Sequence, residues 1–259
     1  MKAYDCVQAS RSAGRPTALS YIGAMIDGFM EMHGDRRFGD DPAVVAGVGT
    51  LCGMPVTVIG IEKGNTTAEK LRRNFGSANP EGYRKALRQI RLAEKFHRPI
   101  LCLVDTSGAY CGIGAEERGQ GEAIAENMYE LMTVRTPCIS VIIGEGGSGG
   151  ALALAVADEV WMLEDAYYSV ISPEGAASIL WKDAGRAKEA AEQLRLTARD
   201  LREFGVIEEI VPAADSREEG MPKLTDALHA RFEALRKKDM AELLEARYQR
   251  FRRIGGEAK

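Results

Sequence analysis

The chain has 259 residues, of which 45% are hydrophobic and 28% charged, a composition typical of a folded globular protein with a sizeable core. A formal net charge of −4 argues against nucleic acid as the main partner. No apolar run approaches the roughly 18 residues of a membrane span, and the polar N-terminus does not resemble a signal peptide. The five cysteines are scattered and never spaced C-x-x-C, so they predict neither a disulfide framework nor a zinc site. We therefore expect a cytoplasmic protein without a membrane anchor or a metal.

The first half of the chain predicts an alternation of helices and strands. Residues 1–14 are polar and are expected to be a flexible N-terminal segment, and residues 15–259 are interpreted as one domain. Arg15-Pro16-Thr17 opens a predicted helix, whose buried face is expected to carry Leu19, Ile22, Met25, Ile26 and Phe29. A loop at 33–42 precedes strands at 44–51 and 55–62, which the tripeptide 52–54 joins as a hairpin. The next helix begins at Pro80, because proline is favoured in a first helical turn.

The second half predicts a parallel sheet covered by helices. The strand at 100–104 is apolar on both faces and is therefore expected in the middle of the sheet, and a glycine-punctuated loop follows at 105–120. Shorter strands are expected at 159–163, 168–171 and 206–211, and the C-terminal helices begin at about residue 221. The basic run at 247–253 is interpreted as a solvated helix face, with a binding patch as the alternative. The alternation indicates α/β architecture, in which ligands bind at the carboxyl ends of the strands.

The stretch from 138 to 157 carries the strongest local signal in the sequence. An apolar run at 139–143 breaks into five glycines and then continues in small helix-forming residues, which predicts a buried strand, a tight turn and a closely packed helix. Ser148 is the expected N-cap of this helix. Gly149 and Gly150 would then hold the first free N–H groups, where a negatively charged ligand oxygen is favoured. Two interpretations remain open, an oxyanion hole and a glycine-rich turn that only permits close packing.

Other catalytic motifs fit this stretch less well. Residues 146–150 satisfy G-x-S-x-G, the nucleophile elbow of serine hydrolases, with Ser148 as the nucleophile. Two of the three histidines, His33 and His97, precede the serine, against the hydrolase order, and His229 lies in a charged helical stretch. The glycines match neither a Rossmann fingerprint nor a P-loop. What remains is a site without an evident acid, base or nucleophile, in which backbone amides would stabilise an enolate-like oxyanion.

Several long motifs together resemble one known family. They are R-P-T-A-L-x-Y-I, H-G-D-R-R-F-G-D-D-P-A-V-V, R-R-N-F-G, P-E-G-Y-R-K-A, G-A-E-E-R-G-Q-G-E-A-I-A, G-E-G-G-S-G-G-A-L-A and Y-S-V-I-S-P-E-G. In this order they resemble the α subunit of the bacterial acetyl-CoA carboxylase carboxyltransferase over about residues 15–212. The resemblance implies a ClpP/crotonase-like α/β fold of repeated ββα units with helical N- and C-terminal segments. It also implies a transferase of lipid metabolism that acts in fatty acid biosynthesis.

The resemblance further implies partners, a cofactor and a reaction. A carboxyl group would pass from carboxybiotin, held on a separate biotin carboxyl carrier protein, to acetyl-CoA, giving malonyl-CoA. A β subunit of the same fold would share the active site, in a hetero-oligomer of two α and two β subunits that works with biotin carboxylase. In the family the glycine pair at the positions of Gly149 and Gly150 donates to the biotin oxyanion, and biotin itself is the base. The β subunit supplies the donors for the thioester, and also a zinc ribbon.

Further candidate binding residues surround the glycine turn. Ser107 and Gly108 in the loop after the central strand, and Gly146 and Gly147 in the turn, are candidates for substrate contact. A basic segment could steer anionic CoA phosphates or carboxylated biotin, with a solvated basic turn as the alternative; its residues are Lys63, Lys70, Arg72 and Arg73. The chain departs from the family at Ser107 and Cys111, where many relatives have proline, which puts the rigidity of that loop in doubt. A scaffold without a catalytic role is the remaining alternative.

Overall fold

The computed structural model describes residues 1–216 and 220–256, and its centre is one mixed sheet. The strands are β1 (Asp27–Glu31), β2 (Val44–Leu51), β3 (Met54–Ile61), β4 (Ile100–Thr106), β5 (Cys138–Gly147), β6 (Glu159–Leu163), β7 (Tyr167–Ser169) and β8 (Glu209–Val211). Their order is β1-β2-β3-β4-β5-β6-β8, with β7 paired to the far end of β5. The β1–β2–β3 pairs are antiparallel and the others are parallel. The carboxyl ends of β3, β4 and β5 therefore meet at one edge.

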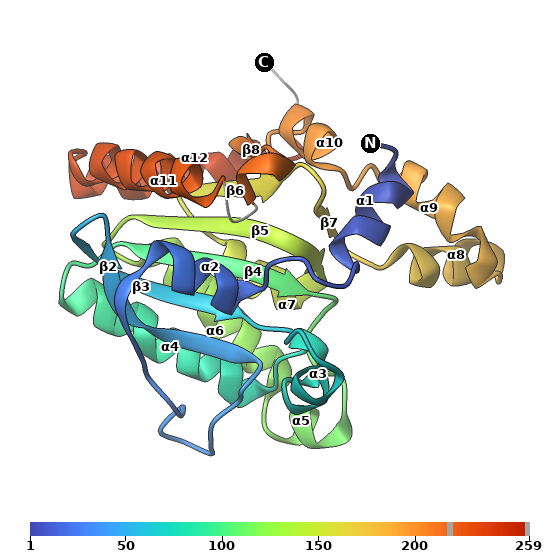
Figure 1. Cartoon of the computed structure of the whole chain (residues 1–259), viewed down its shortest axis with the longest axis horizontal. Helices are drawn as coiled ribbons and strands as arrows, with labels where there is room; N and C mark the ends of the chain where they lie inside the picture. The colour runs from blue at the N-terminus through green and yellow to red at the C-terminus, as the bar shows by residue number, and fades with distance from the viewer. Residues whose placement is uncertain (217–219, 257–259) are drawn as a thin grey trace.

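Helices cover both faces of this sheet. They are α1 (Ala3–Ser10), α2 (Ala18–Met25), α3 (Thr67–Arg72), α4 (Pro80–Lys95), α5 (Ile113–Glu117), α6 (Gln120–Thr133), α7 (Ser148–Ala155), α8 (Pro173–Trp181), α9 (Ala187–Leu194), α10 (Ala198–Glu203), α11 (Met221–Arg236) and α12 (Met240–Arg253). Figure 1 shows α2 in front of the sheet and α4 and α6 behind it, with α8 and α9 projecting to one side. Among the residues described, none of these helices is both long and apolar enough to cross a membrane.

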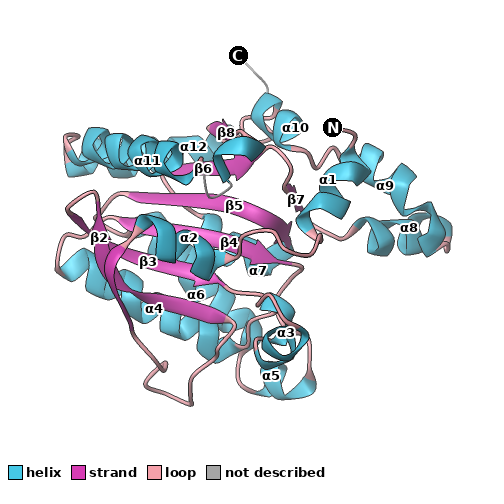
Figure 2. Cartoon of the chain, viewed as in Figure 1, coloured by secondary structure: helices cyan, strands magenta, loops and turns pink. Residues whose placement is uncertain are grey.

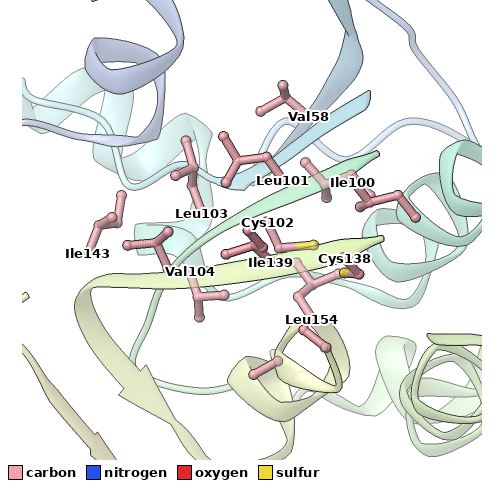
Figure 3. Packing of buried hydrophobic residues seen from close by; sticks show 14 of the residues in the cluster. Val58, Ile100, Leu101, Cys102, Leu103, Val104, Cys138, Ile139, Ile143 and Leu154 are labelled. Atoms are coloured by element: carbon pink, nitrogen blue, oxygen red, sulfur yellow. The ribbon is translucent and has the colours of Figure 1, made fainter. Parts of the chain in front are cut away.

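The hydrophobic core lies on both sides of β4 and β5. Every residue of these two strands is buried, because parallel strands in a sheet covered on both faces meet no water. Figure 3 shows side chains of β4 and β5 with neighbours from β3 and α7: Val58, Ile100, Leu101, Cys102, Leu103, Val104, Cys138, Ile139, Ile143 and Leu154. The predicted central strand and the predicted hairpin are confirmed, the latter turning through Cys52 and Gly53 at φ of 48° and 79°.

The N-terminal region differs from the sequence-based expectation in two respects. Residues 1–14, expected to be flexible, contain the helix α1, whose Cys6 and Val7 are buried, the latter beside α9 and β7. The helix expected to continue as far as Phe29 ends at Met25, and Phe29 lies in β1. The spacing of apolar residues could not distinguish a helix that continues to Phe29 from a helix followed by a strand, because α2 and β1 follow each other without a loop and both pack on the same core. Leu19, expected in the core, is 37% exposed.

The basic run at 247–253 is only partly the solvated face that was expected: Tyr248, Gln249, Arg252 and Arg253 are exposed, but Arg247 and Arg250 are buried. Arg247 is 1% exposed and donates to both carboxylate oxygens of Asp158, at 2.9 and 2.8 Å. It also donates to three carbonyl oxygens at the end of α6 and just beyond it, those of Leu131, Val134 and Thr136. Arg250 pairs with Glu208 at 2.6 Å. The planar guanidinium thus closes the end of α6 and fixes α12 against the sheet.

Replacing Arg247 by methionine should destabilise the fold by about 3–5 kcal/mol, because Asp158 would remain buried without its partner. Urea unfolding measures this free energy. Arg252→Met, which removes an exposed arginine from the same helix, is the matched control and should change little. Equal stability of the two variants would contradict the structural role of Arg247.

Candidate functional site

The site is built where β5 passes directly into α7. β5 remains paired with β7 as far as Gly147, opposite Ser169, and α7 begins at the next residue. The change from strand to helix is therefore made at Ser148, whose φ is +51°. This backbone conformation is uncommon for a residue other than glycine and recurs at functional turns.

Ser148 is not the N-cap that the sequence predicted. The N-cap is Gly147, and no side-chain hydrogen bond caps α7. Ser148 is the first residue of α7, one position after the last β5–β7 pair, and it is exposed. This geometry does not support the hydrolase alternative, which requires a histidine base close to Ser148. None of the three histidines lines the hollow beside Ser148, and His33 instead lies 3.1 Å from Asp40.

The glycines of the turn differ in what surrounds them. A Cβ atom on Gly147 would lie 2.2 Å from the Ser107 carbonyl oxygen, and one on Gly150 would lie 2.5 Å from the Ala109 amide nitrogen. The loop after β4 therefore packs directly on the turn, and these two positions require glycine. A Cβ on Gly149 would meet only Ile124, at 3.7 Å. The candidates Gly147, Gly150, Ser107 and Gly108 are thus brought together.

The loop after β4 is held in place although it lacks the two prolines. The Thr106 hydroxyl accepts from the Gly108 amide at 3.0 Å and donates to its carbonyl oxygen at 2.8 Å. The Gln120 amide group donates to the Tyr110 carbonyl oxygen at 2.8 Å. These hydrogen bonds restrain the backbone of the loop, a restraint that proline would provide by fixing φ.

The beginning of α7 offers unpaired donors beside an apolar hollow. The first amides of a helix have no intrahelical acceptor, and the helix dipole places partial positive charge there. Gly149 and Ser148 line a hollow of about 280 Å³ together with Leu152, Tyr168, Ser169, Val170, Leu201 and Val206. An oxyanion here would meet backbone donors in largely apolar surroundings, where hydrogen bonds to charge are strong.

A network of charges lies at the same edge of the sheet. Asp105, fully buried at the end of β4, accepts from the Glu145 amide at 3.0 Å and pairs with Lys63 at 3.1 Å and with Arg15. Glu145 pairs with Lys63 and with Arg11, the latter at 2.7 Å, and accepts from the Tyr167 hydroxyl at 2.7 Å. The network therefore connects the N-terminal segment, β3, β4, β5 and β7.

These contacts keep Glu145 ionised. Burial favours the neutral form of this carboxyl group, but Lys63, Arg11 and Tyr167 outweigh it and hold the pKa of Glu145 at about 2. Burial, and then the charge of Glu145, raise the pKa of Tyr167. Tyr167 therefore stays protonated and donates its hydrogen bond.

Residues of this network also line a polar cavity of about 210 Å³. Its lining includes Arg11, Arg15, Lys63, Lys70, Phe75, Ser107 and Glu145. Three of the predicted binding residues, Lys63, Lys70 and Ser107, therefore line the same cavity. Two others are not part of the cavity: Arg72 is exposed on α3, and Arg73 donates to the Pro42 carbonyl oxygen at 2.7 Å. Gly146 packs against Tyr168 instead.

Sequence reasoning missed most of this network. Arg11 and Arg15 belong to a segment that had been interpreted as a polar tail or a helix start, and Glu145 was not singled out among the glycines. The available signal was a pair of carboxylates, Asp105 and Glu145, at the ends of two buried strands. Such carboxylates need cationic partners, since an unpaired buried charge is very unfavourable.

Comparisons with known proteins agree on one family. The family model described as acetyl co-enzyme A carboxylase carboxyltransferase-like matches residues 1–255. The chain is similar to the acetyl-coenzyme A carboxylase carboxyl transferase subunit alpha of Ruminiclostridium cellulolyticum, with 67% identity over 82% of this chain and 81% of the relative. It is also similar to that of Clostridium acetobutylicum, with 56% identity over 95% and 92%. A Natranaerobius thermophilus relative, named subunits beta/alpha, is 54% identical over 97% of this chain and 42% of its own length.

Solved structures confirm the fold at low sequence identity. Transcarboxylase 12S gives a TM-score of 0.69 at 18% identity, over 88% of this chain and 44% of that chain. A Pseudomonas malonate decarboxylase hetero-tetramer in complex with coenzyme A gives 0.67 at 17%, over 82% and 86%. The predicted α/β fold of this class is therefore confirmed.

Loss of the Glu145 charge should weaken the fold and change its response to acid. The pKa of Glu145 lies near 2, below its ordinary value of 4.5, so its stabilising contribution is present above pH 4.5 and is lost as the pH falls towards 2. Glu145→Gln should therefore be less stable at neutral pH and lose less stability across that window than the wild type. Urea unfolding between pH 7 and pH 3 measures both effects. Glu117→Gln, at an exposed position, is the control. The argument would be contradicted if the wild type and both variants lost the same free energy of unfolding as the pH falls.

Proposed function

The chain belongs to the family of carboxyltransferase α subunits of acetyl-CoA carboxylase, and we propose that with a β subunit it transfers a carboxyl group from carboxybiotin to acetyl-CoA. One observation carries the proposal. The turn at the start of α7 offers backbone donors to an oxyanion in a hollow whose lining, among the residues that the structure describes, contains no carboxylate, histidine or lysine. We infer that the base of the reaction arrives with the substrate.

The residues of the chain suit carboxybiotin in this way. When bound, carboxybiotin supplies the carboxyl group and a ureido oxygen that serves as the base. The amides of Gly149 and Gly150 would donate to the negative charge on that oxygen. Leu152, Tyr168 and Val170 would exclude water from it, which strengthens these hydrogen bonds. This arrangement stabilises charge that develops during the reaction.

The polar cavity has a separate proposed role. Lys70 lines it, and no ion pair of Lys70 occurs among residues 1–216 and 220–256, whereas Lys63 is engaged by Asp105 and Glu145. We therefore assign long-range attraction of anionic substrates to Lys70 and the exposed Arg72, and a positioning role to Lys63. Arg73 is held by a carbonyl oxygen and is the weakest of the predicted steering residues.

A β subunit is the proposed partner at the apolar flank of the site. Val170, Ile179 and Leu180, which follow β7 or lie on α8, are 76%, 73% and 59% exposed. Large exposed apolar side chains beside an incomplete site favour a protein interface. The Natranaerobius relative carries beta and alpha subunits in one chain, which supports this pairing. Membership of the family is also the basis for three further proposals. They are assembly as two α with two β subunits, contacts with the carrier protein and biotin carboxylase, and a cytoplasmic location.

Reconstitution tests the function directly. The isolated chain should not form malonyl-CoA, whereas the chain with its β subunit, carboxybiotin and acetyl-CoA should. Formation of malonyl-CoA is followed by mass spectrometry, with the β subunit alone as the control. Full activity of the isolated chain would contradict a site shared between subunits, and activity with a different acyl-CoA would redefine the acceptor.

The glycine turn yields a variant pair that separates catalysis from folding. Gly149→Ala meets no close contact within the chain and should fold and bind the β subunit. Its methyl group would lie beside the hollow that Gly149 lines and would obstruct the approach of a ligand oxygen to the amide. Turnover should therefore fall roughly a hundredfold to a thousandfold, an effect comparable to the loss of one oxyanion donor. Gly150→Ala should instead impair folding, because its Cβ collides with the loop after β4. Melting temperature, complex mass and malonyl-CoA formation distinguish the two.

Ser148→Ala is the control for this pair. Ser148 caps nothing, so turnover should be largely retained. Abolished turnover in a stable Ser148→Ala complex would revive the hydrolase interpretation. Near-normal turnover of an assembled Gly149→Ala complex would place the oxyanion donors elsewhere.

A further inference from the structure

A second hollow, of about 490 Å³, lies along α4 and is unusually rich in cations. It is lined by Asp35, Arg36, Arg37, Arg84, Leu87, Arg88, Arg91, Leu92 and Lys95. Figure 2 shows the neighbouring elements, the helix α4 and the long loop between β1 and β2. We call this hollow the α4 groove. It shares no lining residue with the hollow beside Ser148 or with the polar cavity.

Two guanidinium groups are held side by side in the groove. Arg36 Nη1 and Arg88 Nη2 both donate to the His33 carbonyl oxygen, at 2.8 and 3.1 Å. Arg88 also donates to the Gly34 carbonyl oxygen at 3.1 Å. Burial, and then the charge of Arg36, lower the pKa of Arg88, whereas the carboxylates of Asp40 and Asp35 act in the opposite direction. Arg36 is held there at a φ of +65°, a strained conformation for this residue.

The carboxylates near the groove are engaged by other cations. Asp35 pairs with Arg84 at 2.7 Å and accepts from three amides of its own loop, while Asp40 pairs with Lys85 at 2.6 Å. Glu130 and Glu126 pair with Arg91 and Arg37 from α6, at 2.7 and 3.8 Å. Within the described part of the chain, three cations of the groove have no carboxylate partner: Arg36, Arg88 and Lys95.

The spacing on α4 adds to this excess of positive charge. Arg84, Arg88, Arg91 and Lys95 follow each other at intervals of three or four residues and therefore occupy one face. Like charges at these spacings destabilise a helix. Asp35 and Glu130 compensate Arg84 and Arg91, so Arg88 and Lys95, together with Arg36 from the loop, carry the positive charge that lacks a carboxylate partner. A multivalent anion would remove this repulsion. The guanidinium groups also match phosphate oxygens, to which arginine donates two parallel hydrogen bonds.

We propose that the α4 groove binds a polyphosphate anion of the kind carried by nucleotides. The polyphosphate pairs with Arg36, Arg88 and Lys95, and Leu87 and Leu92 offer an apolar floor for the remainder of the ligand. The inference is independent of the carboxyl transfer, because it concerns residues outside that site and is tested by binding to the isolated chain.

Titration calorimetry on the full chain tests the proposal, with inorganic triphosphate as the first probe and citrate as a carboxylate of similar charge. Triphosphate should bind at least tenfold tighter than citrate, and its affinity should fall as salt rises. Adenosine triphosphate and coenzyme A distinguish two sources of the same phosphate chemistry. Tighter binding of either than of inorganic triphosphate would identify the source and show that the apolar floor contributes.

Arg36→Gln/Lys95→Gln removes two exposed cations and should weaken triphosphate binding at least tenfold. Lys237→Gln/Lys238→Gln removes the same charge from the exposed segment that follows α11 and is the matched control, with affinity expected within twofold of wild type. Arg88→Gln provides a third variant, with melting temperature as its folding check. Three outcomes would overturn the proposal. The first is equal affinity of the two double variants for triphosphate, and the second is equal affinity of the wild type for citrate and triphosphate. The third is a dissociation constant for triphosphate above about 1 mM, which corresponds to a binding free energy weaker than about −4 kcal/mol.

Discussion

The structure depends on the pairing of Asp105, a carboxylate with no exposed surface at the end of β4. An isolated ion in this position costs several kcal/mol of desolvation, so the fold must bring cations and donors to it. It does so from three segments far apart in the sequence. Arg15 comes from the N-terminal segment, Lys63 from the loop just after β3, and the Glu145 amide from the neighbouring strand. The requirements of one carboxylate thereby fix the edge of the sheet at which the site is formed.

The consequences extend to the glycine turn. Asp105 accepts from the Glu145 amide, and Glu145 lies two residues before Gly147 on β5. The loop that leaves Asp105 then packs its backbone onto Gly147 and Gly150. Because the turn is clamped between this loop and β7, Ser148 must adopt a left-handed conformation to start α7. The position of the helix amides is therefore set by packing and by charge pairing, before any ligand arrives.

The sequence predicted what local patterns determine and failed where distant residues decide. The strand at 100–104 and the hairpin at Cys52 and Gly53 follow from apolar runs and turn residues, and the structure confirms them. The burial of Arg247 could not be foreseen, because its partners Asp158 and the end of α6 lie about a hundred residues away along the chain. The position of the N-cap could not be foreseen either. Serine is a favoured N-cap residue, but Gly147, which pairs with β7, is the N-cap of α7, one residue before Ser148.

Glycines that look equivalent in the sequence have different physical roles in the turn. At Gly147 and Gly150 the missing side chain admits the chain's own backbone, so these residues would be required even without a ligand. At Gly149 the space beyond the backbone contains only Ile124 at ordinary contact distance, and the residue lines the apolar hollow. A need for close packing therefore explains two of the three glycines but leaves Gly149 unexplained. Approach of a ligand oxygen to an uncovered helix amide accounts for that remaining glycine, which is why the oxyanion interpretation depends on position 149 more than on position 150.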